Sequence, residues 1–336
     1  MAKFYYGGQA MIEGVMMRGR RSVAVAIRRP EGEIYLHKED LEPKIYQNKY
    51  LRWPFVRGVI MLWEMLVLGT RLMTFSANIA TGAIDPTGQY VAADADSQSQ
   101  AVTTDLASGE EKPAALGGVS LALAMVIPLG FAVAIFFVLP LLLTSLLHNQ
   151  IGTGWLNVLV EGLIRLALLL GYLTLIGRLP DIQRVFGYHG AEHKAINTME
   201  QGYPLDVAHV RQASRVHTRC GTGFLLLVMV VSIVVFALVG SPSLLIKIVS
   251  RIVLIPVVAA LAYEIMRLGA SNYRYRIVRW LMAPGLALQG LTTREPDDSM
   301  IECAIASLEY VMARDSEEET PATPAQHEMP APSYPI

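Results

Sequence analysis

The chain has 336 residues, of which 53% are hydrophobic and 17% charged, and its formal net charge is -1. A mean hydropathy of +0.39 is too apolar for a typical soluble domain. The near-neutral formal charge gives no indication of nucleic-acid binding, so no nucleic-acid partner is expected. The composition indicates a membrane protein, with the lipid bilayer as its first partner.

The N-terminal part of the chain lacks a long uncharged apolar segment. Residues 1–53 are expected to form a small cytoplasmic β-rich module, because "SVAVAI" alternates as a strand does and "RRPEGE" joins it to "IYLH" as a hairpin would. Residues 54–80 follow as an apolar helix, on which Arg57, Glu64 and Arg71 recur every seven positions and share one stripe. We predict that this amphipathic helix lies in the membrane interface.

Four later stretches are long and apolar enough to cross a bilayer as helices, which takes about 20 residues. They are 116–147, 155–177, 221–240 and 244–268. The sequence thus predicts a mainly α membrane protein, with a four-helix transmembrane bundle beside the β-rich module. The acidic stretch 81–115 and the tail 315–336 are poor in large apolar side chains and are expected to be flexible.

The basic residues of the connections predict the orientation of these spans. The connections "HNQIGTG" and "GSPS" carry no Lys or Arg, whereas the loop 178–219 carries six. Because cytoplasmic loops hold the excess of Lys and Arg, this loop and both termini are expected in the cytoplasm of a multi-pass cell-membrane protein. The segment 269–314, with an amphipathic helix, falls on the same side. Cys220 and Cys303 also lie there, where thiols stay reduced.

The stretch "FGYHGAEHKAIN", residues 186–197, places two histidines four apart with a glutamate before the second. On a helix His189 and His193 share one face, so both rings can bind one ion. The order H-x-x-E-H is the reversed form of the zinc-protease motif, in which the glutamate, here Glu192, acts as a general base. The alternative is an ordinary polar face of a helix.

A second pair, His217 and Cys220 in "SRVHTRCGTGF", lies just before the third span. If all four His and Cys side chains bind one divalent metal, most simply zinc, the shell is closed and the site is structural. If only three groups bind, an open position can hold a water. Glu264 is the carboxylate alternative for the third ligand, and its competing role is a salt bridge with Arg267 or Arg251.

Charged residues inside the spans need a separate explanation, because they are costly in a bilayer and usually face the bundle interior. Glu161 and Arg165 are four apart on one helix, and one economical packing sets Glu161 against Arg251 of the fourth span. We favour a structural role for these charges over a proton or ion pathway. Near the C-terminus, Asp297 and Asp298 are placed to complement a helix N-terminus, or else to border the histidine site.

Five segments stand out along the chain, in the order "GGQAMIEGVMMRG", "YHGAEHKAIN", "SRVHTRCGTGFLL", "YEIMR" and "PGLALQGLTTREPDD". Together they resemble the YqhQ-like family of bacterial membrane proteins, whose domain is catalogued as domain of unknown function 1385. Members of this family are described as predicted metal-dependent enzymes. The resemblance implies that the matching residues share one functional surface. These residues are Glu13, His189, Glu192, His193, His217, Cys220, Glu264, Arg294 and Asp297.

These observations favour a zinc-type hydrolase acting on a peptide or amphiphilic substrate. Its expected ligands are His189 and His193, with His217 or Cys220 completing the shell and Glu192 as general base. A second hypothesis is a non-enzymatic, metal-stapled membrane scaffold that recruits a cytoplasmic protein partner. A third is a small transporter that uses the charged residues inside the spans.

Overall fold

A computed structural model describes residues 6–41, 53–82, 118–147, 155–239 and 243–316. The strands are β1 (Gly7–Met11), β2 (Gly14–Arg18), β3 (Ser22–Arg28) and β4 (Ile34–Asp40). The helices are α2 (Val56–Ala80), α3 (Gly118–Val133), the π-helical turn η1 (Ala134–Val138), α4 (Leu139–Leu146), α6 (Trp155–Ile176), α7 (Pro180–Glu200), α8 (Val207–Gln212), α9 (Gly221–Val239), α10 (Leu244–Val253), α11 (Ile255–Ser271), α12 (Arg276–Thr292) and α13 (Asp298–Ser316). Most of the two stretches expected to be flexible, 83–115 and 317–336, lies outside the described residues.

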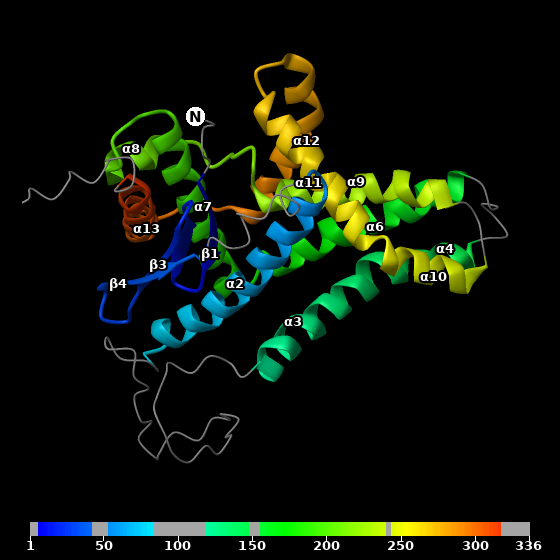
Figure 1. Cartoon of the computed structure of the whole chain (residues 1–336), viewed down its shortest axis with the longest axis horizontal. Helices are drawn as coiled ribbons and strands as arrows, with labels where there is room; N and C mark the ends of the chain where they lie inside the picture. Colours follow the sequence, from blue (N-terminus) through cyan, green and yellow to red (C-terminus); the bar gives the residue numbers. More distant parts are fainter. Residues whose placement is uncertain (1–5, 42–52, 83–117, 148–154, 240–242, 317–336) are drawn as a thin grey trace, which may run out of the picture.

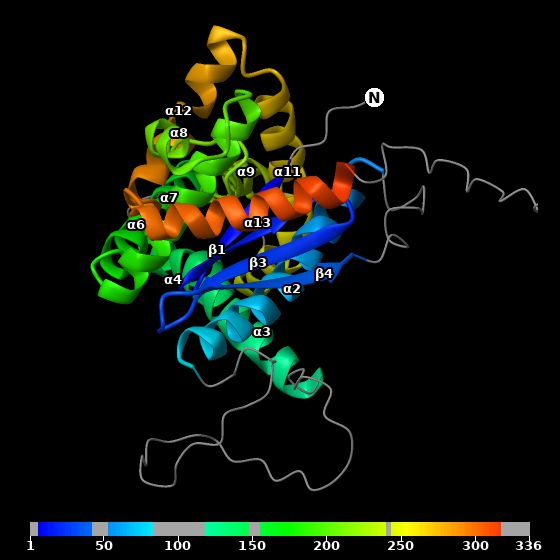
Figure 2. The ribbon, with the colours of Figure 1, turned by 90° about the vertical axis from the view of Figure 1, so that its left-hand side faces the viewer.

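The β-rich module predicted near the N-terminus is a four-stranded antiparallel sheet in the order β1-β2-β3-β4. Side chains alternate between its faces, so each face has its own core. Val15 and Met17 face α7 and α13, whereas Met11 and Met16 face Leu72 of α2. Figure 2 shows α13 crossing one side of the sheet and α2 lying on the other. The sheet is therefore a buried middle layer between helices.

The charged stripe predicted on α2 is present, and each of its members forms an ion pair. Arg57 pairs with Glu264 of α11, Glu64 with Arg18 of β2, and Arg71 with Glu39 of β4. These partners belong to the sheet and to α11, so the stripe binds α2 to its neighbours. By length and hydropathy α2 also qualifies as a membrane span. Its interfacial position remains a prediction.

Four to five of the described helices could span a bilayer by length and composition, which is the pattern of a multi-pass membrane protein. The candidates are Val56–Ala80, Val126–Leu146, Trp155–Ile176 and Gly221–Val239, with the bent pair α10 and α11 as a fifth. Figure 1 shows α6, α9, α4 and α10 extending away from the end that holds the sheet, α7, α8 and α13.

The fourth predicted span, 244–268, is a broken helix in the structure. The chain forms two helices that meet at Leu254 with a bend of 44°. Pro256 lies in the first turn of α11, where its missing N–H is tolerated, whereas a continuous helix would have lost a hydrogen bond there. The short connection "GSPS" predicted a hairpin, but the bend makes its second arm a broken helix.

Candidate metal centre

The helix α7 carries the histidine pair, and glycines allow its close contact with the segment that follows α12. A Cβ atom on Gly190 would lie 2.1 Å from the main-chain oxygen of Arg294, and one on Gly187 would lie 2.6 Å from Sδ of Met300. The Arg294 oxygen belongs to the backbone, so glycine is required at position 190, whereas a Cβ at position 187 would need the flexible end of the Met300 side chain to move. This contact sets the rotation of α7 and thereby the direction of His189 and His193.

Both histidines of α7 use one ring nitrogen to bind a backbone carbonyl. Nδ1 of His189 lies 2.8 Å from the carbonyl oxygen of Thr292, and Nδ1 of His193 lies 2.5 Å from that of Arg215. A carbonyl oxygen only accepts, so each Nδ1 must be the donor. With Nδ1 donating, Nε2 is the nitrogen of each ring that is left to bind an ion, which is the arrangement that metal-binding histidines adopt.

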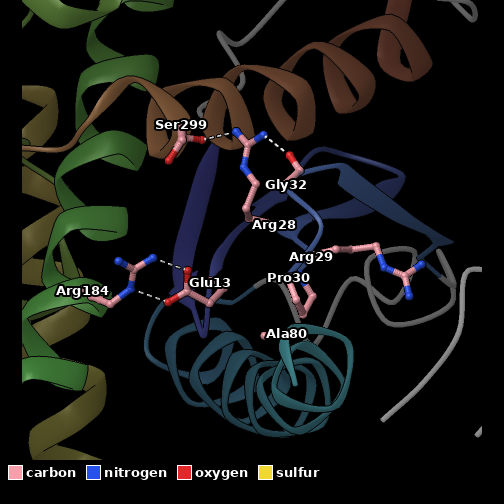
Figure 3. Close-up of a pocket in the computed structure, with 8 residues that line it drawn as sticks. All are labelled: Glu13, Arg28, Arg29, Pro30, Gly32, Ala80, Arg184 and Ser299. Carbon is pink, nitrogen blue, oxygen red and sulfur yellow. Dashed lines mark hydrogen bonds and ion pairs between the residues drawn. The ribbon is translucent and has the colours of Figure 1, made fainter. Parts of the chain in front are cut away.

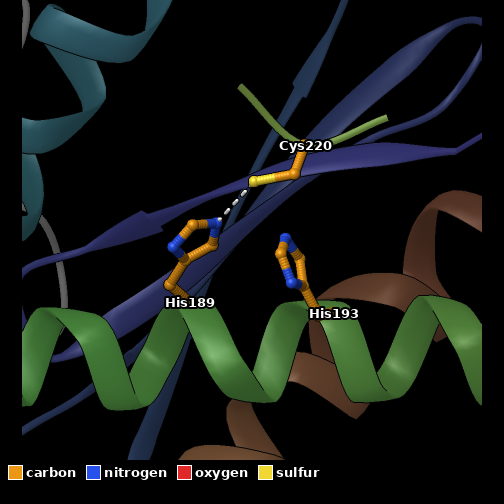
Figure 4. Close-up of side chains that lie close together, drawn as sticks. All are labelled: His189, His193 and Cys220. Carbon is orange, nitrogen blue, oxygen red and sulfur yellow. Dashed lines mark hydrogen bonds between the residues drawn. The ribbon is translucent and has the colours of Figure 1, made fainter. Parts of the chain in front are cut away.

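Cys220 completes a group of three converging side chains (Figure 4). Its Sγ lies 3.3 Å from Nε2 of His189, and the three ligand atoms all lie within 4.8 Å of one another. The sulfur also accepts from the backbone N–H of Thr222 at 3.4 Å, in the first turn of α9. Helix N-termini stabilise negative charge, so the position suits a thiolate. Two imidazoles and one thiolate are a donor set that fits zinc.

His217, predicted as a further ligand, lies beside this group but outside it. Its ring centroid is 5.5 Å from that of His193, yet its Nε2 faces Nη2 of Arg219 at 3.1 Å. Gln289 holds its main chain, accepting from the His217 N–H and donating to the His217 carbonyl. Burial, helped by Arg219, lowers the pKa of His217 to about 3, so the ring is neutral at physiological pH. The converging group therefore has three members.

Glu192 lies next to the group, on the side of the sheet. Its carboxylate accepts a hydrogen bond from the backbone N–H of Gly8, and the side chain is buried. Burial raises the pKa of Glu192 to about 7, against the opposing effects of His189 and the Gly8 N–H. A Cβ on Gly8 would lie 2.9 Å from Cγ of Glu192, so glycine lets the strand approach this closely. The carboxylate is not one of the three converging ligands.

The other carboxylates considered as site residues lie elsewhere. Glu264 binds Arg57 through both oxygens and accepts from the backbone N–H of Phe55, so its partner is neither of the two arginines expected. Asp297 accepts from the backbone N–H of Met300 at 3.0 Å and caps α13, the structural role that the sequence favoured. Neither belongs to the His and Cys group.

Glu13 and Arg294 are on different surfaces. Glu13 is in the turn between β1 and β2 with φ of 54°, and Arg184 of α7 binds both of its oxygens. Figure 3 shows this pair at the edge of a cavity of about 630 Å³ that Arg28 and Ser299 also line. Arg294 contributes through its backbone, which contacts Gly190 and donates to the carbonyl of Phe186. The motif residues thus do not form a single surface.

The charged residues of the spans form one buried cluster, as the packing of Glu161 against Arg251 predicted. Arg165 donates to Glu161 at 2.8 Å, and Arg251 donates to both oxygens of Glu161 at 3.1 and 3.0 Å. Nε of Arg165 also binds the carbonyl of Phe136 at 2.7 Å. That carbonyl precedes Pro140 by four residues, and a proline has no N–H to donate to it. Arg165 therefore donates to a carbonyl that Pro140 cannot serve.

Several residues that shape the centre were not identified from the sequence. The carbonyls of Thr292 and Arg215 orient the histidine rings, and Gln289 clamps His217. Thr292 and Gln289 stand in "PGLALQGLTTREPDD", a segment that did carry the family resemblance. The polar residues Gln289 and Thr292 within this mostly apolar segment were the sequence signal that could have identified them.

Comparisons with known proteins agree with the resemblance. The model of a family described as protein of unknown function (DUF1385) matches residues 53–314. The uncharacterized protein YqhQ of Bacillus subtilis (strain 168) is 34% identical over 307 residues, which is 91% of this chain and 92% of that protein. No solved structure matches the chain significantly. The extent of both matches shows that the chain belongs to the DUF1385 family.

Proposed function

We propose that this protein is a zinc-dependent hydrolase whose centre faces the cytoplasm at the membrane surface. One observation carries the proposal: His189 and His193 both donate from Nδ1 to backbone carbonyls, which leaves Nε2 of each ring for an ion shared with Cys220. Such second-shell bonds fix the tautomer and the direction of metal-binding histidines. A merely solvated polar face would not need them.

Three protein ligands leave a fourth position open, which distinguishes a catalytic zinc from a closed structural one. His217 could close the shell only by leaving Arg219, and its main chain is clamped by Gln289. This geometry favours the hydrolase over the metal-stapled scaffold. A zinc ion bound here would polarise a substrate oxygen and lower the pKa of a bound water.

Glu192 is the residue proposed as general base. It follows His189 by one helical turn, and its pKa near 7 leaves a substantial ionised fraction at neutral pH. In that form its carboxylate takes a proton from the attacking water and returns it to the leaving group. The N–H of Gly8 binds this carboxylate on the side that faces the sheet.

The substrate class follows from the location. The six Lys and Arg residues of the loop 178–219 support a cytoplasmic position for α7, and Cys220 directly precedes the span α9. A centre at this level can reach the ends of membrane-inserted chains. We therefore propose a peptide near a membrane or another amphiphile with a hydrolysable polar end.

The test begins with metal content of the purified full-length protein in nanodiscs. We expect one zinc per chain, lost in His189→Ala and in Cys220→Ser and retained in His209→Ala, because His209 is an exposed histidine that pairs with Asp206. Replacing zinc by cobalt should produce a sulfur-to-metal absorption band that Cys220→Ser lacks. Less than stoichiometric metal in the unaltered protein would refute the proposal.

Activity is tested separately with labelled casein and a p-nitrophenyl ester of a fatty acid. Glu192→Gln should keep full metal occupancy and lose at least a hundredfold in hydrolysis, the usual contribution of a general base. If Glu192→Gln binds metal and hydrolyses both substrates as the unaltered protein does, the carboxylate is not the base. Metal binding with no hydrolysis by any form would favour the scaffold.

A further inference from the structure

The hairpin of α11 and α12 projects from the bundle and exposes large apolar side chains at its tip. Figure 1 shows both helices running across the direction of α6 and α9. Ile277, Trp280 and Leu281 share one face of α12 and are 69, 75 and 63% exposed, and Leu268 near the end of α11 is 62% exposed. These four side chains give the tip of the hairpin an exposed apolar surface.

The same tip is strongly basic. Arg274, Arg276 and Arg279 are exposed, and none of them forms an ion pair with a residue that the structure describes. Arg274 lies over the ring of Tyr275, 4.7 Å from its centroid. The sequence holds no Asp or Glu between residues 265 and 294. The tip therefore carries positive charge that no acidic residue of the described structure neutralises, next to an apolar face.

Several arginines elsewhere on the surface of the protein do have carboxylate partners. Such pairs are Arg184 with Glu13, Arg211 with Asp298, Arg215 with Glu295, and Arg314 with Asp40. The lack of acidic neighbours is thus a property of the hairpin and not of the whole protein surface. An external anion would supply the missing charge.

The other end of α12 reaches the histidine pair. Leu288, Gln289 and Thr292 are buried; Gln289 holds the main chain of His217, and the carbonyl of Thr292 accepts from His189. One helix of 17 residues thus joins the basic apolar tip to the metal centre. The position of the tip relative to the bilayer sets the position of the centre.

We propose that the α11–α12 tip inserts into the interface of an anionic lipid leaflet. Trp280, Ile277 and Leu281 enter the boundary between headgroups and acyl chains, and the arginines bind lipid phosphates. Exposed apolar residues beside Lys or Arg, with a tryptophan, are the pattern of helices that lie in a membrane interface. The neighbouring spans already bring the tip to a bilayer, and the charge selects anionic lipid over a neutral surface.

The experiment uses the full-length protein in vesicles of phosphatidylcholine, with or without phosphatidylglycerol. The signal of Trp280 is the difference between the unaltered protein and Trp280→Phe, because the chain has four tryptophans. Lipids brominated near the headgroup should quench this signal in anionic vesicles, and aqueous acrylamide should not. Each arginine near an anionic surface strengthens membrane binding by roughly fivefold. Replacing Arg274, Arg276 and Arg279 together by glutamine should therefore weaken insertion of the tip by roughly a hundredfold.

The control replaces arginines that already have partners, Arg211→Gln with Arg314→Gln, and should leave the quenching of Trp280 unchanged. The proposal is overturned if acrylamide quenches Trp280 freely in anionic vesicles. It is also overturned if brominated lipid quenches Trp280 in neutral vesicles, and in the triple arginine variant, as strongly as it does in the unaltered protein in anionic vesicles. Protection of Trp280 that depends on protein concentration in detergent would instead assign the tip to a contact between two copies.

Discussion

Replacing Glu161 by glutamine is expected to destabilise the protein more than any other single change in the spans. Glu161 is the one carboxylate between two guanidinium groups, which it binds through three hydrogen bonds of 2.8 to 3.1 Å. All three side chains are at most 2% exposed. Glu161→Gln leaves two buried cations without a counter-charge.

The structure predicts unequal costs for the three members of the cluster. Removing one partner of a buried ion pair costs about 3–5 kcal/mol, which we expect for Glu161→Gln. Arg251→Met leaves a neutral pair of Glu161 with Arg165, so it should cost no more than about 2 kcal/mol, mainly the cation–π contact with Phe236. Arg165→Met also frees the carbonyl of Phe136 and should cost about 1–3 kcal/mol.

The free energy of unfolding can be measured by titrating the protein in mild detergent with dodecyl sulfate and following helix content by circular dichroism. Asp40→Asn serves as control, because its pair with Arg314 is exposed and should contribute less than about 1 kcal/mol. The reasoning fails if Arg251→Met is as harmful as Glu161→Gln, or if Glu161→Gln is as mild as Asp40→Asn. A transporter role would instead predict stable variants that differ in ion flux.

Three further predictions concern the end of the protein that holds the sheet, α7 and α13. Gly190→Ala should displace α7 and abolish metal binding, because its Cβ would meet the oxygen of Arg294, whereas Gly171→Ala has free space and should be silent in the same metal assay. His217→Gln should retain one zinc by metal analysis; loss of the ion would place His217 in the shell. Burial raises the pKa of Cys303 from 9.0 to about 11. Its contribution to stability is therefore present below pH 9 and lost as the pH rises to 11, by up to about 3 kcal/mol, and Cys303→Ala should remove this dependence from unfolding curves measured across that interval.

The sequence by itself determined the elements whose signal is local. Apolar runs of about 20 residues located α6 and α9, and the alternating segment "SVAVAI" located β3, because burial in a bilayer or a sheet imposes those patterns directly. The spacing of Glu161 and Arg165 and the cost of buried charge were enough to pair Glu161 with Arg251. The histidine spacing likewise placed His189 and His193 on one face.

Only the tertiary structure decided which residues complete the centre. Cys220 and His217 are three residues apart and are equally plausible as ligands from the sequence. In the structure Cys220 directly precedes α9 and its Sγ lies beside His189, whereas Arg219 and Gln289 hold His217. The partner of Glu264 was likewise undecided, because Arg57 is 207 residues away. Ligand choice depends on the packing of α7, α9 and α12 against one another, and contacts between segments so distant in sequence leave no periodic pattern in the chain.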